Sequence, residues 1–534
     1  MTASVPAEPG RPPATSIDAG SAVPAGESDW TSGYALPRRE KIITLAGSML
    51  GLFLAALDQT VVSTAGPLIQ RDLHIAPAIY PWLTTSYLVA TTVMVPVFGK
   101  LSDQVGRRKT LLAGLLLFLA GSMLCGAAWS TWSLVAFRAV QGLGAAALYT
   151  SGFSVIADLF PPAERGRYQG LFGAVFGISS LIGPLLGGIL TDRLSWHWVF
   201  FVNLPLGLLA LSLVWNHMPP GHRRAPGEAL HVDAWGALLL VTSIAPLLFA
   251  LSFGRAHVVP GEAGLPWTSP VIVGLLVLAF ASMAAFVVQE RRHREPIVDF
   301  GMYSDRTFSI VTAAGFLVGT GFIAAPIFLP LYLVNVLGTS ATRAGLSMIP
   351  LTLGFVLGAT LGGQMGSRTG RVKPTLLLAL AVLIAGFVLM GTTLRSDSAA
   401  TTVSLRLLVI GIAMGPTMPL MMMAIQNAVG AERIGVATAS LTFSRALGQV
   451  FGVAAMGTIF AAVIGGASGA PVEGGVSAIV RLAASPEGRE AITTGVRTLF
   501  FAGAVSAAAA LLVTFRLPDV QLEKRAPRAK AAAA

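Results

Sequence analysis

Long apolar stretches separated by short polar loops run through most of the chain. Crossing about 30 Å of hydrocarbon takes about 20 helical residues, and fourteen stretches approach or exceed that length. They lie near 42–65, 80–98, 110–129, 132–157, 168–191, 198–216, 232–252, 269–289, 307–334, 343–365, 375–394, 403–424, 436–464 and 497–516. The pattern therefore predicts an all-α membrane protein with 14 transmembrane helices.

Along this pattern, loops rich in basic residues alternate with loops that contain few of them. With the N-terminus inside, the inner segments carry clusters such as Arg38–Lys41, Arg107–Lys109, Arg291–Arg294 and Arg368–Lys373. Most outer loops carry one basic residue or none; the loop 465–496, with Arg481 and Arg489, is the exception. Because cytoplasmic loops retain Lys and Arg, we expect both termini in the cytoplasm and an even number of helices.

Composition supports a membrane protein. Hydrophobic residues make up 54% of the chain and charged residues 11%, against about 25% charged in soluble domains. The net charge of +11 sits in short clusters between apolar runs, which argues against nucleic acid as a partner. The single cysteine, Cys125, lies inside an apolar run, so we expect a buried packing thiol.

The polar segments divide the chain into halves. The stretch beginning Gly99-Lys-Leu-Ser-Asp103 has a weaker echo beginning Gly363-Gln-Met-Gly-Ser367, and duplicated halves are typical of secondary transporters. The expected organisation is a disordered cytoplasmic tail over 1–40, a six-helix bundle over 41–217, two inserted transmembrane helices over 218–300, a second six-helix bundle over 301–517 and a cytoplasmic tail over 518–534.

The loop from Gly99 to Lys109 has the pattern G-x-x-x-D-x-x-G-R-[KR]. Its glycines allow a tight turn, and Asp103 can pair with Arg107 or cap a neighbouring helix. This loop resembles the signature of the major facilitator superfamily, and the chain as a whole resembles its fourteen-helix drug:proton antiporter branch. The resemblance implies a conformational latch at Gly99, Asp103, Gly106 and Arg107; the alternative is a basic loop with an incidental Asp.

Two opposite charges lie inside predicted spans at one depth. Asp58 and Arg138 are each six or seven residues from the outer ends of their helices, or about 10 Å. A carboxylate inside a membrane is costly and indicates function, although a structural ion pair is the alternative. The segments Leu57–Val62 and Arg138–Gly144 also resemble antiporter motifs, which implies a role for Asp58 and Arg138 in proton coupling.

The fifth predicted span has the pattern G-x(8)-G-P-x-x-G-G, which resembles the motif that marks exporters in the family. It supplies Gly173, Gly183, Pro184, Gly187 and Gly188. The segment Trp196–Gly207 resembles a further motif of the same branch. Candidates for a substrate cavity are Gln59, Gln141, Met418 and Met422, although core packing is the preferred interpretation of the methionine cluster. Arg445 lies about nine residues into its span, and the sequence offers no acidic partner for it.

No enzyme signature is present: the sequence contains no H-E-x-x-H, no nucleophile elbow and no ATP-binding loop. We therefore expect no enzyme activity, metal or cofactor, with a proton gradient as the energy source. The predicted function is export of small amphipathic drugs or antibiotics across the plasma membrane by a monomer, whose partners are the substrate, protons and lipid. The alternatives are an exporter of one metabolite, lipid or siderophore, and a receptor or scaffold that transports nothing.

Overall fold

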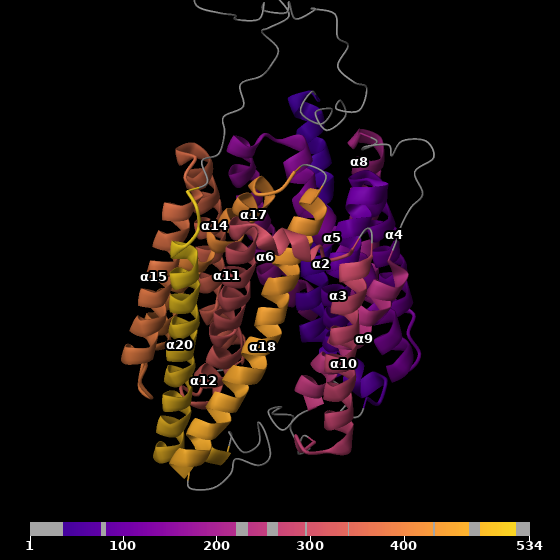
Figure 1. Ribbon diagram of the computed structural model, residues 1–534. Coiled ribbons are helices and arrows are strands. Elements are labelled where there is room, and N and C mark those ends of the chain that lie inside the picture. Colours follow the sequence, from indigo (N-terminus) through magenta and orange to yellow (C-terminus); the bar gives the residue numbers. More distant parts are fainter. Residues whose placement is uncertain are drawn as a thin grey trace, which may run out of the picture.

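A computed structural model describes residues 36–75, 82–219, 233–253, 265–293, 296–339, 341–430, 433–468 and 481–519. These residues form a bundle of long helices and, within the described ranges, no β-strand (Figure 1). The start of α2 and the end of α20 lie at the same end of the bundle. We call this end the terminal face. Of the predicted tails over 1–40 and 518–534, residues 1–35 and 520–534 lie outside the described residues.

The bundle has two halves and an inserted hairpin. The first half contains α2 (Arg38–Asp72), α3 (Trp82–Val105), α4 (Arg107–Gly126), α5 (Thr131–Leu159), α6 (Pro162–Arg193), α7 (Trp198–Phe201) and α8 (Asn203–His217). The hairpin consists of α9 (Ala234–Phe253) and α10 (Pro270–Arg292). The second half contains η1 (Phe300–Ser304), α11 (Arg306–Phe322), η2 (Ala324–Phe328), α12 (Leu329–Asn335), α13 (Ala341–Ser347), α14 (Ile349–Thr369), α15 (Val372–Thr393), α16 (Ala400–Met414), α17 (Thr417–Asn427), α18 (Ile434–Ser468) and α20 (Pro486–Phe515).

The described helices match the predicted spans in number and order. Within the described ranges, thirteen helical segments are long and apolar enough to cross a membrane, and the shorter apolar stretch Ala234–Leu247 of α9 occupies the remaining predicted position. Several spans are built from two consecutive helices, such as α16 and α17. The all-α fold with 14 transmembrane positions is confirmed.

Two predicted boundaries were wrong. The last helix begins at Pro486, inside the segment predicted to be a loop, because the Ser485 side chain accepts a hydrogen bond from the Gly488 N–H (3.0 Å) and caps the helix. The first helix begins at Arg38, so residues 38–40 are helical rather than part of a tail. In both cases the helix continues beyond the apolar segment, which hydropathy alone does not reveal.

The two halves meet along two seams. Helix α3 packs against α18, and α6 packs against α14. The hairpin lies beside the first seam: α9 contacts α3 and α18. Its residues Leu240, Ile244 and Phe286 form one apolar cluster with Val89 and Val93 of α3.

The outside of the bundle is apolar. Exposed side chains include Leu116, Leu208, Phe280, Leu361, Leu405 and Val505, which are 51–71% exposed. An apolar surface of this extent is suited to lipid rather than water. Tryptophans 129, 132, 215 and 235 are also more than 60% exposed, as expected for side chains that anchor a protein at the membrane interface.

Candidate functional site

A buried ion pair joins α2 to α5. The Arg138 guanidinium pairs with Oδ2 of Asp58, and both side chains are 0% exposed. Gln141, one turn after Arg138, donates from Nε2 to Oδ1 of Asp58 (2.9 Å) and accepts from Arg138 Nη1 through Oε1 (2.8 Å). Arg138 also donates from Nε to the Leu83 carbonyl of α3 (2.9 Å). The two charges that the sequence places at one depth are therefore in contact.

Asn203 is a further member of this network that the sequence analysis did not assign to the site. Its Nδ2 donates to Oδ1 of Asp58 (3.3 Å) and to the Ser122 hydroxyl (3.0 Å). The residue lies in the Trp196–Gly207 segment, so the motif itself was the signal. Asp58 thus accepts hydrogen bonds from three side chains, those of Arg138, Gln141 and Asn203.

Aromatic rings and a thiol surround the pair. The Arg138 guanidinium lies over the Tyr87 ring, 4.5 Å from its centroid, and 5.9 Å from that of Phe200. Tyr87 is itself held by a hydrogen bond from its hydroxyl to the Ala55 carbonyl (3.0 Å). Cys125 is fully buried and contacts Gln141, so its predicted buried position is confirmed. Tyr87, Phe200 and Cys125 therefore enclose the network on the sides where they lie.

At the terminal face, the predicted latch joins α3 to α4 through a single residue. Helix α3 ends at Val105 and α4 begins at Arg107, so Gly106 alone makes the turn. Its φ of +99° is a conformation that glycine adopts readily and other residues rarely do. Arg107 pairs with Asp103 and also with Asp158 of α5 (3.2 Å). Arg107 therefore links the turn to α3 on one side and to α5 on the other.

Asp103 also reaches across the first seam to the second half. Its two carboxylate oxygens accept hydrogen bonds from the backbone N–H groups of Gly435 and Val436, each at 2.9 Å. These groups belong to the first turn of α18, where the helix dipole favours a negative charge. Asp103 therefore makes both interactions that the sequence leaves open: it pairs with Arg107 and it caps a neighbouring helix. Gly99 permits this approach, because an added Cβ would lie 2.4 Å from that of Ala439.

The corresponding position in the second half has no such bond. Ser367 faces Gly166 of α6 across the second seam, but its buried hydroxyl has no hydrogen-bond partner among the described residues. The contact there is backbone on backbone: a Cβ on Gly363 would lie 2.1 Å from the Gly166 carbonyl oxygen. A polar link does cross between the halves at Gln169, which donates to Gln426 (2.8 Å).

The glycines of α6 divide between two neighbours. Gly173 packs against Ala359 of α14, and Gly183 packs against Thr60 of α2, close enough that an added Cβ would lie 1.9 Å from the Thr60 hydroxyl oxygen. Gly188 has open space around it, Gly187 accepts a hydrogen bond from Thr191 (2.6 Å), and Pro184 lies inside the helix. The segment therefore fits α6 against both halves.

Comparison with known proteins identifies the family. The model of the Major Facilitator Superfamily matches residues 48–453. The chain is a member of this superfamily. Among its relatives, multidrug resistance protein 3 of Bacillus subtilis is 37% identical over 77% of this chain and 78% of its own length. The tetracenomycin C resistance and export protein of Streptomyces glaucescens is 32% identical over 78% and 75%.

Solved structures agree with the fold. The major facilitator XylE, a proton:xylose symporter, superposes with a TM-score of 0.62 at 14% identity and covers 91% of this chain and 97% of XylE. The human organic anion transporter MFSD10 gives a TM-score of 0.58 at 16% identity over 88% and 100%. At these identities the likeness concerns the fold alone. The family match and the curated relatives make the chain a membrane transporter, and the solved structures agree with its major facilitator architecture.

The residues predicted to line a substrate cavity in this major facilitator have different surroundings. Gln141 and Met422 are 0% exposed in this conformation: Gln141 lies in the ion-pair network, and Met422 lies in an apolar cluster that includes Phe153, Phe172 and Leu420. Met422 packs among buried apolar side chains, and its contact with a substrate stays a prediction. Gln59 and Met418 are partly exposed, and Gln59 donates to the Tyr149 hydroxyl (3.2 Å); their contact with a substrate stays a prediction.

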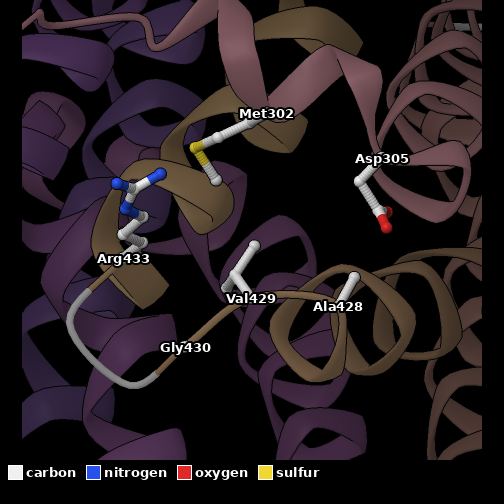
Figure 2. A pocket seen from close by; sticks show the side chains of 6 residues that line it. All are labelled: Met302, Asp305, Ala428, Val429, Gly430 and Arg433. Carbon is white, nitrogen blue, oxygen red and sulfur yellow. The ribbon is translucent and has the colours of Figure 1, made fainter.

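A small pocket opens where η1 and the start of α11 approach the connection between α17 and α18 (Figure 2). Asp305 and Arg433 contribute its charges, and both are already engaged: Asp305 accepts from the Phe308 N–H (2.8 Å), and Arg433 pairs with Asp299 (2.9 Å). No residue of the predicted site lines it. We therefore assign this pocket no part in transport.

Proposed function

We propose that this major facilitator is a proton-driven exporter of small amphipathic compounds that works by alternating access, with its terminal face in the cytoplasm. The observation that carries the proposal is the Asp58–Arg138 pair, buried between α2 and α5. The orientation rests on the basic loops, and the terminal face carries residues such as Arg107 and Arg108. Two multidrug proteins among the relatives support drug export.

Proton binding would act on the pair directly. A proton on Asp58 removes the charge that holds Arg138, so Arg138, Gln141 and Asn203 would each lose an ionic acceptor. Because the pair connects α2 to α5, its loss would favour a different packing of these helices. The conformation described here, in which Asp103 caps α18, would be the one closed toward the cytoplasm.

The available energy is sufficient for this work. One proton moving down roughly 150 mV supplies about 3.5 kcal/mol, at about 2.3 kcal/mol per charge per 100 mV. At about 1.4 kcal/mol per decade, this sustains a substrate gradient of a few hundredfold. No cofactor or metal is required in this proposal.

The test is proton movement coupled to substrate in proteoliposomes. Asp58→Asn fixes the neutral side chain, so it should abolish proton-driven efflux yet leave ligand binding in detergent measurable. Undiminished antiport in this variant would remove Asp58 from the mechanism. Arg138→Ala should also abolish coupling, and it should lower stability because it leaves a carboxylate buried without its partner.

A second candidate is export of a single metabolite. The relative that exports tetracenomycin C is named for one compound, and this observation favours the candidate. Expression in a drug-sensitised cell against a panel of toxic compounds separates the two: resistance to many unrelated compounds supports multidrug export, and resistance to one supports the dedicated exporter.

A further inference from the structure

Arg445 is a second arginine deep within the bundle. It follows the start of α18 at Ile434 by eleven residues, and at about 1.5 Å per residue this places its backbone roughly 16 Å along the helix. This is about half the thickness of the hydrocarbon layer. A charge at that depth is costly unless something compensates it.

Nothing in the described part of the chain neutralises this charge. Within those residues, the Arg445 guanidinium makes no hydrogen bond or ion pair, and no described carboxylate acts on it. The guanidinium lies over the ring of Phe322 in α11, with 5.8 Å from the guanidinium carbon to the ring centroid. Arg138, by contrast, has Asp58, Gln141 and a backbone carbonyl as partners.

Arg445 does not lie on the most exposed side of α18. Phe451 and Thr458 mark the exposed side of α18, and Arg445 lies six residues before Phe451, about 120° around the helix. Gly448 and Gly452, which pack against Phe316 and Thr320 of α11, lie between these two directions. Arg445 itself is partly exposed. Arg445 therefore lies on the side of the α11–α18 contact opposite to Phe451.

An irregular helix segment lies beside it. Directly after Phe322, the π-helical segment η2 interrupts the regular helix over Ala324–Phe328 and contains Pro326. Proline lacks the N–H needed for a regular helical hydrogen bond, and π-helical segments recur at functional sites. Arg445 therefore stands beside an irregular part of the neighbouring span.

We propose that Arg445 binds the anionic group of the exported compound, so that the substrates include amphipathic acids with a carboxylate, sulfonate or phosphate. This inference rests on the proposed export function. A guanidinium presents a planar pair of N–H donors that fits a carboxylate or phosphate with two hydrogen bonds. The Phe322 ring beside it offers apolar surface for the body of the same compound.

Binding to purified protein in nanodiscs tests the inference with a matched pair of probes, 1-pyrenebutyrate and its neutral amide. Arg445→Gln should weaken binding of the acid about 10- to 100-fold, as expected for loss of a charge-assisted hydrogen-bonding partner, and leave the amide within about twofold. Arg445→Lys should bind the acid at an intermediate strength, because lysine keeps the positive charge but lacks the planar pair of N–H donors.

Arg497→Gln is the matched control. Arg497 also lies within a membrane span, but its Nε donates to the Gly391 carbonyl (2.8 Å). This variant should change the affinities of acid and amide by the same factor. If Arg445→Gln also weakens both probes equally, or leaves acid binding intact, the inference is overturned. A thermal unfolding measurement on each variant confirms that the comparison is made on folded protein.

Two further measurements are needed. One distinguishes a lipid headgroup from a soluble acid as the bound anion, and the other distinguishes failure of the export proposal from failure of the Arg445 inference. Phospholipid that stays bound to the wild type in native mass spectrometry and is lost in Arg445→Gln, without binding of pyrenebutyrate, would assign the site to a lipid headgroup and overturn the inference. Proteoliposomes that bind the acid through Arg445 but export neither probe would contradict export alone. Export of the amide, with no binding of the acid, would contradict the Arg445 inference alone.

Discussion

Asp103→Asn tests whether the latch holds the terminal face closed. The carboxylate accepts two backbone hydrogen bonds at 2.9 Å from the first turn of α18 and pairs with Arg107. An amide keeps one acceptor oxygen, so one bond is lost and the other loses its ionic character. At about 1.5–3 kcal/mol for a bond to a charged group, the closed conformation loses about 2–4 kcal/mol. This corresponds to a shift of roughly thirty- to several hundredfold in the closed-to-open ratio.

The assay is a distance measurement across the terminal face, with spin labels on cysteines introduced at Lys109 and Arg371, both exposed. Cys125 is buried and shielded from the label. In Asp103→Asn, the fraction of molecules with a long distance should rise and transport should fall, while expression and folding stay normal. Ser367→Ala should leave both unchanged, because that hydroxyl has no partner in the described residues. Equal loss in both variants, or lost transport with an unchanged distance distribution, would refute the reasoning.

Two other predictions follow from close contacts of the site. Asn203→Leu removes a donor to Asp58 and should lower the free energy of unfolding by about 1–2 kcal/mol and reduce transport, whereas Asn216→Leu in the same helix, where the side chain is exposed, should change neither; equal effects in thermal unfolding would contradict this role. Gly183→Ala places a methyl group against Thr60 and should cost about 1–3 kcal/mol, whereas Gly188→Ala, with open space around it, should be tolerated in the same unfolding measurement.

Features that depend on one helix or on its depth could be predicted from the sequence. Apolar length gave the order of the spans, and equal depth paired Asp58 with Arg138 although 80 residues separate them. Pairing Asp58 of α2 with Arg138 of α5 required no knowledge of how the helices cross, because two buried opposite charges have few other partners.

Features that depend on how helices cross could not be predicted. The sequence allows Asp103 to cap some helix but does not identify α18, whose first turn lies more than 330 residues away. Asn203 reaches Asp58 only because α8 packs beside α2. In the sequence, a methionine that packs in the core looks the same as one that binds a ligand. Met422 is buried because its side of the helix faces the core, and this orientation is visible only in the structure. The start of α20 depended on a cap at Ser485, a local hydrogen bond that hydropathy ignores.

The position of the α9–α10 hairpin makes the two sides of the transporter unequal toward the bilayer. The hairpin lies over the α3–α18 seam, so acyl chains meet its outer surface there rather than the boundary between the halves. Along α6 and α14, exposed leucines and isoleucines such as Leu185, Ile189 and Leu357 face outward. The boundary between the halves is therefore covered by the hairpin along α3 and α18 and left without such a cover along α6 and α14.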